Sequence, residues 1–270
     1  MPNRRPWTSD FERALYKAAF DKDADTALRA AQLWFSGIDT DKVSYEHHRL
    51  IAAVGRRFDT ASALQDRRAM FRNVSKQLWL RAVHNLRDAE TVCAVLRKMR
   101  VPHAHAGHAV WLGHSDNLFL DCEQIEIVVH ENALGLVLRI FCEHGWYPHA
   151  RYAFDRADQK IALQGPRGLR LTLFSAMAAR DLAGQTNAAF WAATTQTTAF
   201  GQSLRTLSPR QTMPLWPLRA KDPLQLLIDC TLSADGDFSA ARTGLPVGRR
   251  FDLWRTRKLL ARTVSQRAVG

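Results

Sequence analysis

The chain has 270 residues, of which 46% are hydrophobic, so it can bury a sizeable core as one domain or two small ones. No run of 18 apolar residues occurs, which excludes a membrane-spanning helix, and the polar, basic first residues predict no signal peptide. The four cysteines are scattered and form no CxxC pair, which predicts buried thiols in a reducing cytoplasm.

The formal net charge of +12 is unevenly distributed along the chain. Residues 1–100 hold 19 Lys and Arg against 12 Asp and Glu, residues 101–150 hold one against six, and residues 151–270 hold 18 against eight. Basic surfaces attract nucleic acid, nucleotides and anionic lipid through long-range Coulomb forces. An arginine-rich surface that serves only solubility has the same net charge, so both interpretations stay open.

The first hundred residues predict a helical region. Apolar residues at helical spacing predict helices over 11–19, over 25–35 with Gly37 at the end, and over 45–58. Residues 62–100 form one long amphipathic pattern with a candidate break near Asp88. This pattern indicates helices that face a core rather than residues that bind a cofactor.

The pattern changes at Pro102, because proline lacks an N–H donor and restrains the residue before it. A short segment from His103 to Ala106 ends at Gly107. A helical turn over 109–112 and a polar loop over 113–117 are expected to follow.

The centre of the chain predicts strands around one helix. The β-branched run 125–129 predicts a buried strand, and Asn132 is the candidate cap of a helix over 133–143 that Gly145 terminates. Three further short strands are expected at 151–154, 160–163 and 169–174.

Helices are expected again after residue 174. Candidates lie at 188–195 and at 222–228, where Asp222-Pro223 starts the helix, and a basic helix covers 249–268. The sequence therefore predicts an α+β protein with an N-terminal helical region (1–100), an α/β core (101–175) and a C-terminal helical region (176–270).

Three motifs follow one another in the centre: the run from Leu96 to Val110, the strand from Gln124 to Val129, and the run from Phe141 to Trp146. Together they resemble the uncharacterised bacterial nucleotidyltransferase family of the DNA polymerase β-like superfamily. Its typical members show a helix ending in L-x-x-x-G-I-P, a strand to L-K-G, a loop with R-x-x-x-D-I-D-L-L-V, and a helix to L-x-x-x-G-[WY]. The resemblance covers most of the chain loosely and is most specific over 96–146. It implies a small mixed sheet of nucleotidyltransferase type with about four or five strands.

Nucleotidyl transfer requires a loop whose backbone N–H groups hold a triphosphate, and carboxylates two residues apart on a strand that hold Mg²⁺. The chain has Ala106-Gly107 where the family has Lys-Gly, and Gln124-Ile-Glu where it has Asp-Ile-Asp. The third acid falls at Arg170 or Thr172, depending on register, and the family arginine is absent from residues 113–123. Loss of one preorganised electrostatic group commonly costs about 3–4 kcal/mol of barrier, so these replacements predict a degenerate site.

The resemblance implies the following candidate residues. Glu126 is the catalytic and metal-binding acid if the protein is active, and Gln124 marks the degenerate position. Gly107 and His108 lie at the nucleotide-binding turn, and Asp121 in the loop is a further candidate metal ligand. Mg²⁺ and an NTP are cofactors only of an active enzyme, and otherwise no cofactor is implied.

Histidines gather around the glycine turn at His103, His105 and His108, with His114 beyond it. His103 and His105 share one strand face, and with Glu126 nearby they are candidate ligands of a transition metal. The alternative is that they are polar residues in a pocket that has lost its function, because no zinc-type ligand spacing is complete.

The basic C-terminal segment is a candidate binding surface. It suits nucleic acid, an acidic partner, or peripheral contact with an anionic membrane, but its aromatic residues are equally suited to pack on the core and leave the cations in water. The candidate binding residues are Arg249, Arg250, Arg255, Arg257 and Lys258.

Three functions remain open from the sequence. The first is a catalytically degenerate nucleotidyltransferase-fold protein that binds a nucleotide, a nucleic acid or a protein. The second is an active enzyme that transfers a nucleotidyl group to a small molecule, saccharide or peptide. The third is a structural or assembly subunit. Gln124 and the missing third acid disfavour the second.

Overall fold

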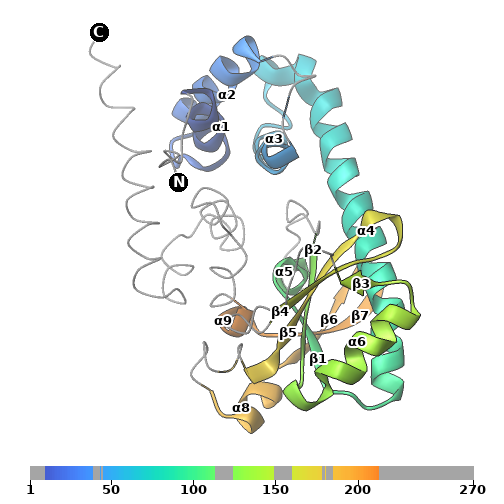
Figure 1. Ribbon diagram of the computed structural model, residues 1–270. Coiled ribbons are helices and arrows are strands. Elements are labelled where there is room, and N and C mark those ends of the chain that lie inside the picture. Colours follow the sequence, from blue (N-terminus) through green and yellow to red (C-terminus); the bar gives the residue numbers. More distant parts are fainter. Residues whose placement is uncertain are drawn as a thin grey trace, which may run out of the picture. The chain divides into compact units, whose positions relative to one another are not determined.

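The computed structural model describes residues 10–38, 43, 45–112, 124–148, 160–177, 180 and 185–212. The chain divides into two compact units, one made of Met1–Trp79 with Ala220–Gly270 and the other of Leu80–Arg219. Figure 1 shows the described helices and strands with their labels. The expected elements at 151–154, 222–228 and 249–268 lie outside the described residues.

The described part of the first unit is helical, as expected. Its elements are α1 (Asp10–Phe20), α2 (Ala24–Gly37), α3 (Tyr45–Arg57), the 3₁₀ helix η2 (Ser62–Arg67) and the start of α4 (Arg68–Lys98). Asp23 caps α2, because its carboxylate accepts a hydrogen bond from the backbone N–H of Thr26 at 2.7 Å. The helix therefore begins one residue earlier than the candidate start at Asp25.

Helix α4 is continuous over 31 residues, and the candidate break near Asp88 is wrong. No glycine or proline interrupts the helix, and small and branched apolar residues recur on one buried face. Arg100 ends it with a left-handed backbone, φ +57°, and the N–H of Val101 donates to the carbonyl of Leu96 at 2.9 Å. Pro102 then prevents the helix from resuming.

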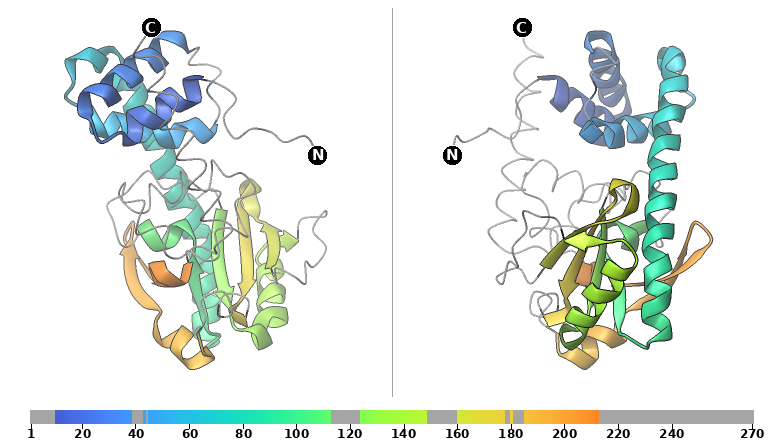
Figure 2. Two further views of the ribbon diagram at one scale, coloured as in Figure 1. Left: turned by 90° about the vertical axis from the view of Figure 1, so that its left-hand side faces the viewer. Right: turned by 45° about the vertical axis from the view of Figure 1, so that its right-hand side comes forward.

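The second unit holds a mixed seven-stranded sheet in the order β3-β4-β5-β2-β1-β7-β6 (Figure 2). The β2–β5 and β1–β7 pairs are parallel, and the other neighbours are antiparallel. This confirms the α+β class but exceeds the expected four or five strands. The strands are β1 (His103–Ala106), β2 (Gln124–Val129), β3 (Tyr147–Pro148), β4 (Lys160–Gln164), β5 (Arg170–Ser175), β6 (Thr195–Ala199) and β7 (Gln202–Thr206).

The hairpin of β6 and β7 accounts for part of the difference between the seven observed strands and the four or five expected. Only helices were expected after residue 174. Phe200 and Gly201 form its two-residue turn, and both have positive φ, 51° and 75°. Positive φ at both central residues suits the right-handed twist of a hairpin. The hairpin extends the sheet because β7 pairs with β1 and the N–H of Leu207 donates to the carbonyl of His105 at 2.8 Å.

Each face of the sheet has its own cover of helices. The second half of α4 and helix α6 (Leu134–Glu143) share one apolar core with Ile125, Ile127 and Leu171. Three short helices cover the other face: α5 (His108–Leu112), α8 (Asn187–Ala192) and α9 (Pro209–Thr212). Alternate residues of β1, β2 and β5 therefore point to two different environments.

The helix after β2 begins differently from the expectation. His130, not Asn132, caps the 3₁₀ turn η3 (Glu131–Ala133) that leads into α6, and its ring accepts a hydrogen bond from the N–H of Asn132. Gly145 terminates α6 as expected, with φ +81° and a hydrogen bond from the N–H of Trp146 to the carbonyl of Phe141 at 2.9 Å. Among the described helices, none combines the length and the apolar character needed to cross a bilayer.

Candidate functional site

The register of β2 and β5 fixes where the sequence-predicted catalytic positions lie. Gln124 is opposite Arg170, and Glu126 is opposite Thr172. Gln124, Glu126 and Thr172 occupy the sheet face covered by α5, α8 and α9, because strand residues alternate and Ile125, Ile127 and Leu171 fill the core on the opposite face. Thr172 is buried, whereas Arg170 at the start of β5 is exposed.

The side chains of Gln124 and Thr172 are hydrogen-bonded to each other across β2 and β5. The side-chain nitrogen of Gln124 donates a hydrogen bond to Oγ1 of Thr172. Both side chains are neutral, so neither supplies the negative charge that Mg²⁺ requires from its protein ligands. A neutral hydrogen bond therefore joins Gln124, where the resemblance implies an acid, to Thr172, one of the two candidate positions of the third acid.

Glu126 is the acid that the sequence retains, and its side chain is only 1% exposed. Its carboxylate lies against the backbone of Gly107, where an added Cβ would be 2.3 Å from Oε2 of Glu126. Gly107 also has φ +62°, a conformation that side chains rarely adopt. The glycine is thus required both for the turn and for the close approach of Glu126.

The backbone N–H of Gly107 has a partner from a distant part of the chain. It donates a hydrogen bond of 2.7 Å to Oγ1 of Thr212 in α9. Thr212 is fully buried, and the residue before it, Gln211, donates to the carbonyl of Phe190 at 2.8 Å and accepts from the N–H of Ser208 at 2.9 Å. The donor that a phosphate-binding turn would present to a nucleotide is therefore used within the protein. His108, the other residue expected at this turn, is buried at the start of α5.

His103 and His105 lie on the same strand face, as expected, but they point away from Glu126. They face α4, on the opposite side of the sheet, because β1 places Ala106 rather than His105 beside Glu126. The hypothesis that these two histidines bind a metal together with Glu126 is therefore wrong. The ring of His103 hydrogen-bonds the carbonyl of Val101 at 2.8 Å, and burial lowers the pKa of His103 although that hydrogen bond opposes the shift.

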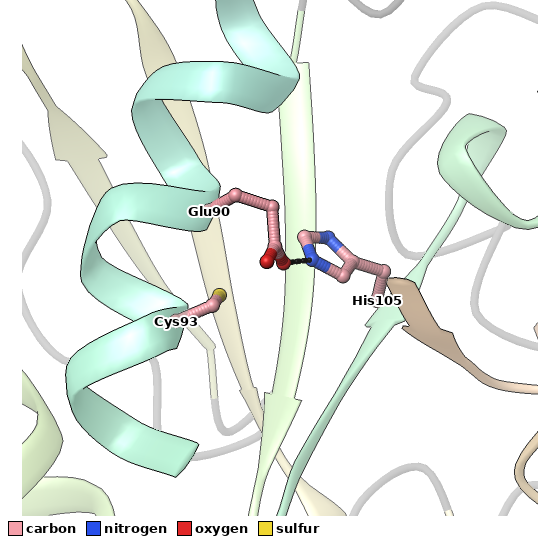
Figure 3. Close-up of side chains that lie close together, drawn as sticks. All are labelled: Glu90, Cys93 and His105. Carbon is pink, nitrogen blue, oxygen red and sulfur yellow. Dashed lines mark hydrogen bonds and ion pairs between the residues drawn. The ribbon is translucent and has the colours of Figure 1, made fainter. Parts of the chain in front are cut away.

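A buried polar cluster forms where His105 meets α4 (Figure 3). Nε2 of His105 is 2.7 Å from Oε1 of Glu90, and Nη1 of Arg97 is 2.7 Å from Oε2 of the same carboxylate. Cys93, one turn after Glu90, directs its sulfur toward the same point. Glu90, Cys93 and His105 each offer one donor atom, and these atoms lie within 4.8 Å of one another.

Protonation in this cluster follows from burial and neighbouring charges. Burial alone would raise the pKa of Glu90, but the hydrogen bonds and positive charge from His105 and Arg97 outweigh it, and the pKa of Glu90 is lowered. Burial, reinforced by the Glu90 carboxylate, raises the pKa of the Cys93 thiol well above its usual value. Without a metal, the cluster therefore consists of a carboxylate that accepts hydrogen bonds from neighbouring donors.

Sequence reasoning missed Glu90 and Cys93, because they fall within a pattern that predicts only a core-facing helix. The available signal was Glu90 itself, an acid in line with the apolar residues Leu86 and Ala89. Thr212 gave no signal, since it lies 105 residues from Gly107. Asp121 and the basic residues of 249–268 lie outside the described residues.

No protein-family model matches this sequence, and no curated protein matches it either.

Proposed function

We propose that this chain is a nucleotidyltransferase-fold protein that has lost metal-dependent nucleotidyl transfer and acts by binding an acidic macromolecule. The observation that carries the proposal is the hydrogen bond between Gln124, where the resemblance implies an acid, and Thr172, one of the two candidate positions of the third acid. Two-metal catalysis depends on carboxylates that hold cations against the attacking and leaving oxygens. A neutral amide and a hydroxyl on the same face do not replace that charge.

The surroundings of Gly107 support a partner other than a free nucleotide. The N–H of Gly107 donates to Thr212, and the residue before it is Ala106, where the family has a lysine. A triphosphate at this turn would have to displace the Thr212 hydroxyl without a lysine to compensate. Of the partners that the sequence leaves open, nucleic acid and acidic protein therefore fit better than an NTP.

A basic stripe on the second half of α4 favours nucleic acid among these partners. Arg87 and Lys98 are both exposed and lie 11 residues apart, which is close to three helical turns and places them on one face. Thr91 and Ala94 are exposed between them. The two acids of this helix do not oppose the stripe, because Asp88 is half-buried and Glu90 is buried and paired with Arg97. Such a face attracts a phosphate backbone without reading its sequence.

The test measures binding of fluorescently labelled duplex and single-stranded oligonucleotides by anisotropy at several salt concentrations. We expect salt-dependent binding that weakens on the order of tenfold in Arg87→Ala/Lys98→Ala at low salt, with a salt slope shallower by about 1.8 for two lost duplex phosphate contacts. The matched control is Lys22→Ala/Arg29→Ala, which removes the same charge from exposed positions around α2. Equal weakening in both variants would contradict the assignment to α4, and absence of binding would contradict the choice of nucleic acid.

An active enzyme is the alternative, and it depends on Glu126. It predicts that ATP, CTP, GTP or UTP with Mg²⁺ raises the melting temperature, and that labelled NTP yields a labelled product in lysate that disappears in Glu126→Ala. We expect neither effect.

A further inference from the structure

We infer that Glu90, Cys93 and His105 form a binding site for a single Zn²⁺ ion that ties α4 to β1. The three side chains converge from two adjacent elements, and their donor atoms lie within 4.8 Å of one another (Figure 3). Thiolate, imidazole and carboxylate together are the ligand set that zinc accepts, whereas Mg²⁺ prefers oxygen ligands alone. The site lies on the face of the sheet opposite Glu126, so it is independent of the proposed function.

The backbone places these ligands without rearrangement of either element. Glu90 and Cys93 are three residues apart in α4, so both side chains leave the same side of the helix. His105 alternates with Ala104 and Ala106 in β1, whose side chains belong to the core on the other face. All three ligands are buried, and Cys93 is part of the apolar core beneath α4. Water competes weakly for an ion in such a place.

Metal binding requires a local shift of the ligands and the loss of protons from the ligand atoms. Ligands of a tetrahedral ion with bonds of about 2.0–2.1 Å are about 3.3 Å apart. The 2.7 Å between Nε2 of His105 and Oε1 of Glu90 must therefore lengthen by about 0.6 Å. The thiol proton of Cys93 leaves to solvent as the Zn–S bond forms, and Nε2 of His105 gives up the proton that it shares with Glu90. These three ligands leave the fourth coordination position of the ion open.

The charges of the ligands balance the charge of the bound ion. The Cys93 thiolate and the Glu90 carboxylate neutralise the two charges of the ion. Arg97 retains its contact with Oε2 of Glu90, and its side chain is 43% exposed, so its charge is largely hydrated.

The experiment titrates the full-length, chelator-treated protein with Co²⁺, whose complexes with thiolate show a charge-transfer band in the near ultraviolet. We expect one Co²⁺ per chain, displacement by Zn²⁺, and release of at least one proton in calorimetry performed in buffers of different ionisation enthalpy. The band should persist when Cys122, Cys142 and Cys230 are all replaced by serine, and it should vanish in Cys93→Ser. His105→Gln should weaken the affinity on the order of tenfold or more.

Folding of each variant is checked by circular dichroism and thermal melting, and Zn²⁺ should raise the melting temperature of the chain that retains only Cys93. If this chain is folded but gives neither a Co²⁺ band nor a Zn²⁺-dependent rise, the zinc site is overturned. A band that survives Cys93→Ser would likewise assign the metal to other residues. Because no NTP or nucleic acid is present, failure here is separate from failure of the proposed function.

Discussion

The side-chain amide of Gln124 donates a hydrogen bond to the hydroxyl of Thr172, its neighbour across two parallel strands. The same face carries Glu126, which is opposite Thr172 in the register. Neutral groups on two of these three side chains let the face be buried without mutual repulsion of carboxylates. Of these three side chains, only that of Glu126 carries a carboxylate, and a single acid is easier to bury than three.

Placing acids at Gln124 and Thr172 should create a site for Mg²⁺. In Gln124→Asp/Thr172→Asp three carboxylates share one buried face, so without a cation the melting temperature should fall because like charges repel. Mg²⁺ at about 100 times its dissociation constant should recover about 2.7 kcal/mol of unfolding free energy. Melting curves with and without Mg²⁺ measure both effects. Gln124→Asn/Thr172→Asn is the uncharged control, and a Mg²⁺-dependent rise in the control or the parent chain would contradict the prediction.

The contact between Gly107 and Glu126 should be measurable as a coupling energy. Gly107→Ala should cost about 1–2 kcal/mol for its left-handed backbone, and a further cost arises because the Glu126 carboxylate occupies the place of the new methyl group. Urea unfolding of the two single variants and the double variant with Glu126→Ala gives the coupling. When Gly107→Ala is introduced into the Glu126→Ala chain, it should cost only the free energy of the left-handed backbone.

Gly135→Ala is the control for the glycine substitution itself, because nothing lies within 4 Å of its added methyl group. It should be neutral or stabilise α6 by up to about 1 kcal/mol. An equal cost of Gly107→Ala with and without Glu126 would disprove the contact.

Gln211 should contribute more to stability than its position in a four-residue helix suggests. It is 1% exposed, and its amide contacts the carbonyl of Phe190, Oε1 of Gln185 and the N–H of Ser208. Gln211→Leu leaves buried polar groups without partners and should cost about 1–3 kcal/mol in urea unfolding. The exposed Gln196 on β6 is the control, and Gln196→Leu should change stability by less than about 0.5 kcal/mol. Similar effects at both positions would show that Gln211 does not organise this turn.

The capping hydrogen bonds of α2 predict the direction in which the pKa of Asp23 is shifted. Hydrogen bonds from the side chain and the backbone N–H of Thr26 lower the pKa of Asp23 below its ordinary value of 3.8. The ionised carboxylate therefore stabilises the helix fully at pH values above 3.8. This contribution is lost as the pH falls through the lower pKa of the folded state. NMR titration of the Asp23 carboxyl group measures the pKa directly. Thr26→Val removes the side-chain partner and should raise the pKa part of the way, whereas a pKa of Asp23 at or above 3.8 in the parent chain would refute the cap.

Local sequence was sufficient for most of the described elements. Helical spacing of apolar residues predicted α1, α2, α3 and α6, and the β-branched run 125–129 predicted β2, because these periodicities depend only on which side of an element is buried. The β6–β7 hairpin was missed although Thr195 to Thr198 are strand-forming and Phe200-Gly201 suits a tight turn. Its strands are largely polar, so hydrophobic periodicity gave no signal for them.

By itself, the sequence determined which residues stand at the positions that its resemblance compares with charged groups, namely Ala106, Gln124, Arg170 and Thr172, since residue identity needs no coordinates. Only the tertiary structure decided that Thr172, and not Arg170, is opposite Glu126, because strand register is set by pairing between distant segments. It also decided that Thr212 reaches Gly107 and that His105 faces Glu90 and Cys93 rather than Glu126. These contacts join residues that are far apart in the chain, and which face of a strand meets which helix is a property of the whole packed sheet.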